Sequence, residues 1–257
     1  MKAKVLFNKK INENCYKMGI ESREFVKNAK PGQYLMVDVK KGRDIFDPLI
    51  NRAFAVSCVG ETSFSLLYKI VGKGTHLLST FHEFEDIEIS KPLGNTFTID
   101  INDKNVAIIA GGIGIAPFLW LSKLLIERKN HITLYYGGKS AIDIVLLDDL
   151  KSPANEVIIS TEDGTMGKKG LITDFVVDKA FDRVYMCGPT AMMGAAVNMF
   201  NSNCFIEVSM EEKMACGIGL CMGCIVYYNE DGCVNKKCCK DGPIFDGRKV
   251  LWQKQLH

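Results

Sequence analysis

The segment that indicates the fold class reads Val106-Ala-Ile-Ile-Ala-Gly111-Gly112-Ile-Gly114-Ile-Ala-Pro117. Its first five residues form an uninterrupted apolar run, which is typical of a strand buried in a parallel sheet. The three glycines predict a turn, and the proline suits the first position of a following helix. Strand, glycine-rich turn and helix together can cradle a phosphate with backbone N–H groups. The segment is not a complete dinucleotide fingerprint, because the proline stands in place of the third glycine.

Strands and helices alternate on the C-terminal side of this segment. A helix is predicted at 118–128, and further strands are predicted at 131–137, 156–161 and 183–186. The alternation predicts a parallel sheet with helices on both faces, and ligands of such sheets bind at the carboxyl ends of the strands.

Two of these strand ends carry candidate nucleotide contacts. Glu162 and Asp163 could accept hydrogen bonds from ribose hydroxyls and would repel a 2′-phosphate, which favours NADH over NADPH, although a polar surface loop would look the same. Cys187, Gly188 and Pro189 follow the last predicted strand. The Cys187 thiol lies either near a bound nicotinamide or in the core as an inert side chain.

Residues 1–100 have the pattern of a small antiparallel β-barrel. Short strand-like runs alternate with turn signals. The predicted strands are 3–7, 15–19, 33–39, 54–58, 64–70 and 85–90. Within this region, Arg52 lies two residues before Phe54 and could present a guanidinium to a phosphate beside a ring for a planar cofactor. The loop Gly72-Lys-Gly-Thr75 precedes a predicted helix and could receive a pyrophosphate, or it could be a plain strand-to-helix turn.

The most specific motif is a group of cysteines near the C-terminus. Cys216, Cys221 and Cys224 follow the spacing C-x4-C-x2-C, and three further cysteines at 233, 238 and 239 could supply a fourth ligand. This is the plant-type spacing for a [2Fe–2S] cluster, with glycines that let backbone N–H groups approach sulfur. A structural zinc site usually needs two CxxC hooks, and a disulfide framework needs an oxidising compartment. Both remain as alternatives to the cluster.

Composition limits the remaining classes of function. The chain has 257 residues, a net charge of +2, 47% hydrophobic residues and 24% charged residues. These values are ordinary for a folded protein and do not indicate a nucleic-acid or membrane partner. The sequence shows neither a signal peptide nor an apolar run long enough to span a membrane. Ten cysteines in this context predict a reducing, cytoplasmic location.

Taken together, these patterns predict a multi-domain β plus α/β protein. The expected parts are an antiparallel β-barrel at 1–100 that could bind a planar cofactor, a parallel-sheet NAD-binding domain at 101–206 and a small [2Fe–2S] subdomain at 207–257.

Several motifs in order along the chain resemble the ferredoxin–NADP⁺ reductase superfamily. They are Arg52-Ala-Phe-Ala, Gly72-Lys-Gly-Thr75, Pro92-Leu-Gly-Asn95, Gly111-Gly-Ile-Gly-Ile-Ala-Pro117 and Cys187-Gly-Pro189. The tail from Glu211 to Phe245 indicates a narrower family, because it resembles the electron-transfer subunits of class 1B dihydroorotate dehydrogenases. That resemblance selects Cys239 as the fourth cluster ligand, because the last cysteine of the family precedes x-Asp-Gly-Pro.

The resemblance implies FAD contacts in three segments. They fall on Arg52, Ala53, Phe54, Ala55, Leu67, Tyr68, Lys69, Gly74 and Thr75. The family usually has Arg-Pro-aromatic/Ile-Ser in the first segment, whereas this chain has Ala53 and Ala55 in place of the proline and the serine. Losing the serine hydroxyl removes a hydrogen bond worth about 0.5–1.5 kcal/mol.

The resemblance also implies an electron relay. NADH docks across the 111–117 turn and the Cys187–Pro189 strand end, and electrons pass through FAD and the cluster. The implied partner is a catalytic FMN-containing dihydroorotate dehydrogenase subunit in a heterotetramer of two plus two, with no nucleic acid or membrane involved. No catalytic acid, base or nucleophile is expected in this chain. The alternatives are another reductase of the superfamily, such as a ferredoxin–NADP⁺ oxidoreductase or sulfhydrogenase subunit, and a zinc-stapled binding module.

Overall fold

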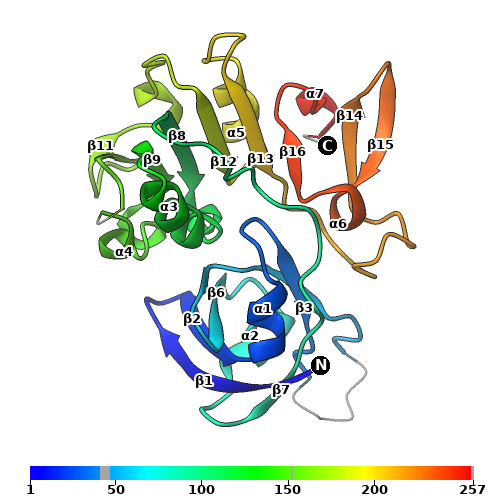
Figure 1. The fold of residues 1–257 in the computed structure, drawn as a ribbon. Coiled ribbons are helices and arrows are strands. Elements are labelled where there is room, and N and C mark those ends of the chain that lie inside the picture. The colour runs from blue at the N-terminus through cyan, green and yellow to red at the C-terminus, as the bar shows by residue number, and fades with distance from the viewer. Residues whose placement is uncertain (41–46, 152, 256–257) are drawn as a thin grey trace.

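The computed structural model describes residues 1–40, 47–151 and 153–255. Figure 1 shows three parts: an N-terminal β domain, a central sheet with helices packed against it, and a smaller C-terminal part beside the central sheet. Within the described ranges, no helix has the length and apolar character needed to span a membrane.

The N-terminal strands are antiparallel, as predicted, and form a sheet and a separate ribbon. The sheet has the order β5-β6-β2-β1-β7, and β3 pairs with β4 in the ribbon. The strands are β1 Lys2–Lys10, β2 Cys15–Glu21, β3 Tyr34–Val37, β4 Arg52–Ala55, β5 Cys58–Val59, β6 Ser63–Lys69 and β7 Asp86–Glu88. Isolated bridges from Tyr34 to Leu93 and from Val37 to Ile89 join the ribbon to the end of the domain. The described strands therefore do not close into one continuous hydrogen-bonded barrel, and Pro92, which has no N–H, lies between the two bridging positions.

Two short helices cover this domain. The first, α1 (Arg23–Asn28), was not predicted; it begins where the Phe25 N–H donates to the Ser22 hydroxyl at 3.3 Å. The second, α2 (Lys73–Ser79), begins within the Gly72–Thr75 loop that was predicted to precede a helix. It follows β6 directly, so its first turn lies next to the strand end that carries Lys69.

The central part is a seven-stranded sheet of order β11-β10-β9-β8-β12-β13-β16. Its pairs are parallel except that of β13 with β16. The strands are β8 Asn105–Gly111, β9 His131–Gly138, β10 Glu156–Thr161, β11 Lys168–Lys169, β12 Arg183–Cys187, β13 Phe205–Ser209 and β16 Ile244–Asp246. The predicted strands at 106–110, 131–137, 156–161 and 183–186 are all present within a residue or so of their bounds.

The apolar run in β8 is explained by burial on both faces of the sheet. Val106, Ile108 and Ala110 belong to one apolar core, and Ala107 and Ile109 belong to another. Because successive side chains of a strand point to opposite faces, this strand needs apolar residues throughout.

Helices cover both faces, as predicted. Helix α3 (Phe118–Glu127) packs in the first of these cores and α5 (Thr190–Val197) packs in the second. The remaining helical elements are η1 Gly112–Ile115, η2 Ala141–Asp143, α4 Leu147–Lys151 and η3 Ile172–Phe175.

The C-terminal part is attached to the central sheet by one of its own strands. It consists of the hairpin β14 (Ile225–Asn229) and β15 (Cys233–Lys237), then α6 (Cys238–Asp241), β16 and α7 (Trp252–Gln255). Strand β16 pairs antiparallel with β13, so the cysteine-rich part continues the sheet edge. In Figure 1 it stands beside β13 and above the N-terminal domain.

Candidate functional site

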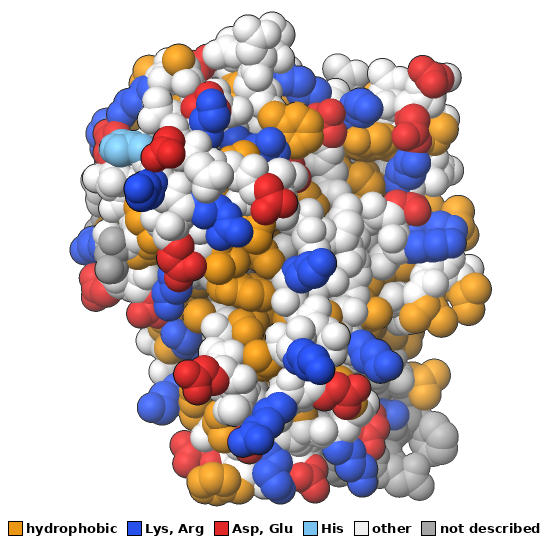
Figure 2. Space-filling model, viewed as in Figure 1, with side chains coloured by type: hydrophobic (Ala, Val, Ile, Leu, Met, Phe, Trp, Pro, Cys, Tyr) orange, Lys and Arg blue, Asp and Glu red, His pale blue; other side chains and the backbone are white. Residues whose placement is uncertain are grey.

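The three parts of the chain meet around one cavity of about 370 Å³. The N-terminal domain contributes residues from β3, β4, β6 and the start of α2, and the central sheet contributes Ile113 and Ala116. The third wall is the segment from Ser209 to Met214, together with Pro243. In Figure 2, hydrophobic side chains gather near the middle of the face, between the upper and lower parts of the molecule.

The structure brings the predicted flavin residues together at this cavity. Eight of the nine line it: Arg52, Ala53, Phe54, Ala55, Leu67, Tyr68, Lys69 and Thr75. The ninth, Gly74, lies against Arg52, since a Cβ at that position would be 2.7 Å from the Arg52 Nε. The absence of a side chain at 74 thus lets the guanidinium approach the first turn of α2.

The loop before α2 is held by Thr75. Its hydroxyl oxygen accepts the N–H groups of Val71 at 2.9 Å and Gly72 at 3.2 Å, and it lies 3.0 Å from the Gly72 carbonyl. The Thr75 hydroxyl is therefore occupied within the loop, and its contribution to the cavity is to fix the backbone of that loop.

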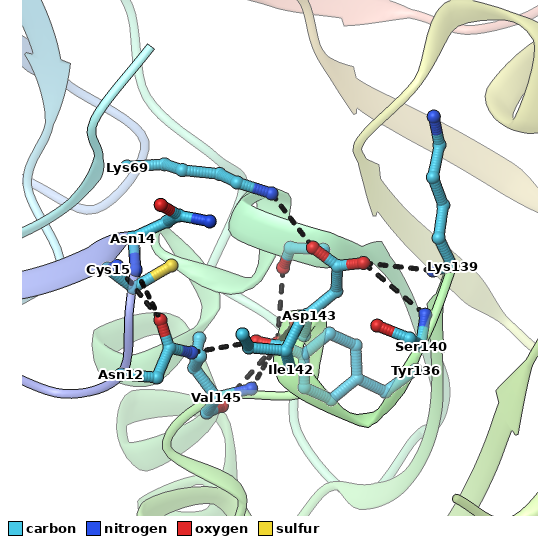
Figure 3. Close-up of polar contacts among 11 residues, drawn as sticks. Asn12, Asn14, Cys15, Lys69, Tyr136, Lys139, Ser140, Ile142, Asp143 and Val145 are labelled. Atoms are coloured by element: carbon cyan, nitrogen blue, oxygen red, sulfur yellow. Dashed lines mark hydrogen bonds and ion pairs between the residues drawn. The ribbon is translucent and has the colours of Figure 1, made fainter. Parts of the chain in front are cut away.

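A polar network joins the N-terminal domain to the central sheet at one side of the cavity (Figure 3). The Lys69 ammonium lies 2.9 Å from Asp143 Oδ1, and Asp143 Oδ2 accepts the backbone N–H groups of Lys139 and Ser140 at 3.2 and 3.4 Å. Burial opposes ionisation of Asp143, but the hydrogen bond and charge of Lys69 outweigh it and lower the pKa of the carboxyl. The hydrogen bond to Asp143 raises the pKa of Lys69. The pair is thus held in its charged form.

The two predicted NAD segments pack directly against each other. A Cβ at Gly114 would be 2.5 Å from the Cys187 carbonyl oxygen, and a Cβ at Gly111 would be 2.5 Å from Pro189 Cδ. Gly188 has a φ of +149°, and a Cβ there would be 2.8 Å from the Gly111 nitrogen. These glycines are required because two backbone segments lie in contact at the carboxyl ends of adjacent strands.

The other NAD candidates lie at the same edge of the sheet. Pro117 precedes the first residue of α3, as predicted for the start of that helix. Glu162 and Asp163 follow β10, two strands from β8 in the sheet order. Asp163 Oδ1 accepts from the backbone N–H and hydroxyl of Thr165 at 2.9 and 2.7 Å, and these bonds lower its pKa. Glu162 is exposed.

The residues that line the cavity include several that were not predicted from the sequence, among them Tyr34 and Glu211. Tyr34 lines it from β3, and Glu211 lines it from the segment that leads to the cysteines. The Cys187 thiol is fully buried and lies 3.7 Å from Glu211 Oε1. Glu211 is exposed as a residue, but desolvation of its carboxyl raises its pKa. Burial also raises the pKa of the Cys187 thiol well above its ordinary value. No local motif marks Tyr34. Glu211 begins the tail that carries the family resemblance, but its contact with Cys187 joins two separate segments.

The first cysteine loop places backbone N–H groups on sulfur. Cys216 Sγ accepts the N–H of Leu220 at 3.3 Å and that of Cys221 at 3.4 Å. Hydrogen bonds from Ile218 and its neighbours lower the pKa of the Cys216 thiol to about 6. Gly217 and Gly219 have φ values of +68° and +82°, a region that suits glycine and lets the loop wrap around the thiol.

The three candidates for the fourth cysteine, Cys233, Cys238 and Cys239, lie in different surroundings. The backbone N–H of Cys239 lies 3.4 Å from Cys224 Sγ, and both residues are buried. Burial raises the pKa of Cys239 to about 12. Cys238 instead directs its sulfur to the Met210 carbonyl at 3.2 Å, and the exposed Cys233 lies 3.4 Å from the Lys254 ammonium. Of the three cysteines left open by spacing, Cys239 is the one whose backbone N–H lies at hydrogen-bond distance from the sulfur of Cys224.

Backbone N–H groups point at two of the four predicted cluster thiols, those of Cys216 and Cys224. These hydrogen bonds group the four cysteines in pairs, Cys216 with Cys221 and Cys224 with Cys239. Within residues 1–40, 47–151 and 153–255, no three Cys, His, Asp or Glu side chains are grouped so that they could hold a metal ion. Sulfur atoms that accept backbone N–H groups from a glycine-rich loop are typical ligands of iron–sulfur clusters, because these bonds stabilise thiolate charge.

The fold and this cavity define a class of protein. An antiparallel β domain, a parallel nucleotide-binding sheet and a cysteine-rich tail that meet at one cavity are the parts of a ferredoxin–NADP⁺ reductase-type oxidoreductase with an iron–sulfur extension. Residues 108–198 match the oxidoreductase NAD-binding domain, and residues 211–251 match the iron–sulfur cluster binding domain of dihydroorotate dehydrogenase B.

Full-length relatives identify the family. The chain is 38% identical to the dihydroorotate dehydrogenase B (NAD(+)) electron transfer subunit of Caldanaerobacter subterraneus subsp. tengcongensis, covering 98% of each chain. It is 36% identical to the same subunit of Clostridium acetobutylicum, covering 96% of each. The chain belongs to the family of dihydroorotate dehydrogenase B (NAD(+)) electron transfer subunits. The predictions of family, fold class and oxidoreductase function are therefore confirmed.

Solved structures agree on the fold. The structure of an NADH-dependent reduced ferredoxin-NADP oxidoreductase, described for flavin-based electron bifurcation, superimposes with a TM-score of 0.83 at 30% identity, covering 99% of this chain and 91% of that one. The ferredoxin reductase of carbazole 1,9a-dioxygenase superimposes with a TM-score of 0.63 at 19% identity, over 77% of this chain and 64% of that one. The second likeness concerns the fold alone.

Proposed function

We propose that this chain transfers electrons between NAD and a dihydroorotate-oxidising partner subunit, as part of pyrimidine biosynthesis. FAD, a [2Fe–2S] cluster and NAD are its cofactors. Bound FAD would supply the chemistry that links a two-electron hydride carrier to a one-electron cluster. The observation that carries the proposal is the composition of one cavity. The segment from Ser209 to Met214, which leads directly to Cys216, lines the same cavity as Arg52 and Lys69.

The N-terminal domain holds the flavin in this proposal. Arg52 supplies a guanidinium for the pyrophosphate, and Phe54 and Tyr68, whose ring centroids are 5.8 Å apart, supply aromatic surface for the ring system. Ala53, Ala55 and Leu67 contribute to the cavity wall. Since neither alanine has a hydroxyl, binding there depends on backbone groups and on shape.

The central sheet holds the nicotinamide nucleotide. The glycine turn at 111–114 gives an anion close access to the backbone, and the turn adjoins the Cys187–Pro189 strand end. Glu162 serves the ribose at the same edge, with Asp163 as a second acceptor whose first oxygen is already bonded to Thr165. The division into domains at 1–100, 101–206 and 207–257 follows from these three roles.

The cysteine-rich part holds the cluster through Cys216, Cys221, Cys224 and Cys239. Backbone N–H groups that point at the sulfurs of Cys216 and Cys224 stabilise the thiolate charge and so favour ligation. No acid, base or nucleophile of this chain is assigned to the pyrimidine step. That chemistry belongs to the partner, and the residues of this chain bind, orient and shield the cofactors.

The partner is a catalytic subunit that contains FMN, in a complex of two plus two chains. Ile218, Leu220 and Met222 are exposed by 62%, 77% and 49% and lie between the first and third cluster cysteines. In Figure 2 hydrophobic side chains gather at the right edge, where the cysteine-rich part lies. Contiguous exposed apolar residues commonly mark a protein interface. A cytoplasmic location is supported by ten free thiols.

Reconstitution with the partner tests this function. The holoprotein, combined with an FMN-containing dihydroorotate-oxidising subunit, is expected to reduce NAD⁺ when dihydroorotate is added. Leu220→Asp in the exposed loop should weaken the complex, whereas Leu171→Asp, at an exposed position in the central domain, should not. A wild-type chain that binds FAD and iron but supports no dihydroorotate-dependent NAD⁺ reduction would contradict the proposed partner.

A second candidate function is a subunit of a ferredoxin-linked NAD(P) oxidoreductase. It is favoured by the structural likeness at a TM-score of 0.83 and 30% identity. The same reconstitution separates the two, because a ferredoxin-linked subunit would reduce ferredoxin and would not couple to dihydroorotate.

A further inference from the structure

One buried tyrosine joins the wall of the flavin cavity to the cysteine loops. Tyr34 is the first residue of β3, is 3% exposed and lines the cavity. Its hydroxyl oxygen lies 3.0 Å from the carbonyl oxygen of Gly217 and 2.9 Å from that of Cys239. The phenol has a single proton, so the two carbonyls share it.

The two carbonyls belong to opposite halves of the cysteine set. Gly217 follows Cys216, which is hydrogen-bonded to Cys221, whereas Cys239 is bonded through its N–H to Cys224. The Tyr34 hydroxyl therefore contacts Gly217, the neighbour of Cys216 in the first pair, and Cys239, a member of the second pair.

The tyrosine itself is fixed on the N-terminal side. Its backbone exchanges two hydrogen bonds with Leu93, at 3.1 and 2.9 Å. A Cβ at Gly94 would be 3.1 Å from the Tyr34 ring and 2.5 Å from Pro243 Cδ, so the ring is closely packed. Two residues along β3 and on the same face, Met36 packs against Gly217, where a Cβ would be 2.9 Å from the Met36 Cγ.

From these contacts we infer that Tyr34 is a positioning residue that sets the placement of the cysteine loops relative to the flavin cavity. The inference rests on the proposed function, because it concerns the single-electron exchange between FAD and the cluster. One electron leaves one centre and arrives at the other, and the hydroxyl proton stays on Tyr34. The hydroxyl acts by holding two backbone segments of the cluster site and by stabilising negative charge near them.

The test uses Tyr34→Phe in the full chain loaded with FAD and cluster. After NADH is added, reduction of the cluster should slow by about tenfold or more relative to reduction of the flavin in the same protein, because a small misplacement of reacting groups has large effects on rate. The reduction potential and the electron paramagnetic resonance spectrum of the cluster should also shift. The control is Tyr135→Phe, which removes one hydroxyl bond, to the Val177 carbonyl at 3.2 Å, in the central domain.

A second variant keeps the inference testable if the phenylalanine protein loses its cluster. Tyr34→p-aminophenylalanine restores an N–H donor on a ring of nearly the same size. Recovery of two irons per chain and of the cluster potential supports the hydroxyl bond, and no recovery overturns it. Wild-type rates and spectra in Tyr34→Phe would also overturn it. If instead the wild-type chain binds neither FAD nor iron, the proposed function itself has failed.

Discussion

The Lys69–Asp143 ion pair gives the sharpest prediction about how the N-terminal domain is held to the central sheet. The Lys69 side chain is 36% exposed and the Asp143 side chain is 15% exposed, and their charged atoms are 2.9 Å apart. A fully exposed pair is worth about 0.2–1 kcal/mol. Partial burial strengthens this one, while water still screens the lysine. The expected coupling free energy is about 1 kcal/mol, or roughly a fivefold change in an equilibrium constant.

A double-mutant cycle isolates the coupling free energy of the Lys69–Asp143 pair. The variants are Lys69→Met, Asp143→Asn and the double variant, and their free energies of unfolding are compared by urea denaturation at saturating FAD. Trp120 on α3 packs against the N-terminal core, so its fluorescence reports the contact between the two domains. Asp143→Ala should cost about 1 kcal/mol more than Asp143→Asn, because it also removes the acceptor for Lys139 and Ser140.

The pH dependence of the coupling follows from the pKa directions. The pKa of Asp143 is lowered on folding, so its contribution is complete above the ordinary carboxyl pKa and disappears as pH falls through the lowered value. The pKa of Lys69 is raised, so its contribution is complete below the ordinary lysine pKa and disappears as pH rises through the raised value. The coupling should be constant between about pH 5 and pH 9. A coupling within about 0.3 kcal/mol of zero at pH 7 would refute the reasoning.

Three further substitutions test other parts of the account. Cys239→Ser should reduce iron below two per chain while FAD stays bound, whereas the control Cys233→Ser should leave the iron and FAD contents unchanged. Iron and flavin analysis measures both, and equal loss of iron and FAD from Cys239→Ser would count against this ligand assignment. Gly74→Ala should weaken FAD binding by about tenfold, because the added Cβ would be 2.7 Å from the Arg52 Nε, although alanine stabilises the helix itself. Fluorescence titration measures the FAD affinity, and an unchanged affinity would show that the position of the Arg52 side chain is unimportant for FAD binding. Glu207→Gln should lower the free energy of unfolding by about 1–3 kcal/mol, because the buried carboxylate accepts hydrogen bonds from Thr98 and pairs with Arg183 at 3.5 Å. A change below about 0.5 kcal/mol, measured by urea denaturation, would contradict this prediction.

Local signals were sufficient where a physical requirement acts along the chain. Residues 106–110 had to be apolar throughout because both faces of β8 are buried, so the strand could be predicted from its pattern. Likewise the spacing of Cys216, Cys221 and Cys224 reflects a loop that wraps around its own sulfur atoms. Both features are specified by residues within one short segment.

Contacts between distant segments could not be predicted in this way. Tyr34 reaches Cys239 across 205 positions, and Lys69 reaches Asp143 across 74. Nothing near either residue in the sequence identifies its partner. Strand β16 is three residues long and pairs antiparallel at the edge of a parallel sheet, so its hydrophobic pattern is too short to recognise.

The choice among Cys233, Cys238 and Cys239 shows the same limit. All three lie within seven residues, and spacing alone left them equivalent. The family resemblance selects Cys239 as the predicted ligand, and the surroundings of Cys238 and Cys239 differ in the structure. The Cys239 N–H faces Cys224, while the Cys238 sulfur is turned to the Met210 carbonyl in the core.

The electron relay is tested most directly by an anaerobic absorbance spectrum of the purified chain, with iron, zinc and flavin analysis, before and after NADH is added. The account predicts one FAD and two irons per chain, with flavin bands and broad visible iron–sulfur absorbance that bleach when NADH is added. A colourless protein that holds one zinc and no flavin would contradict it.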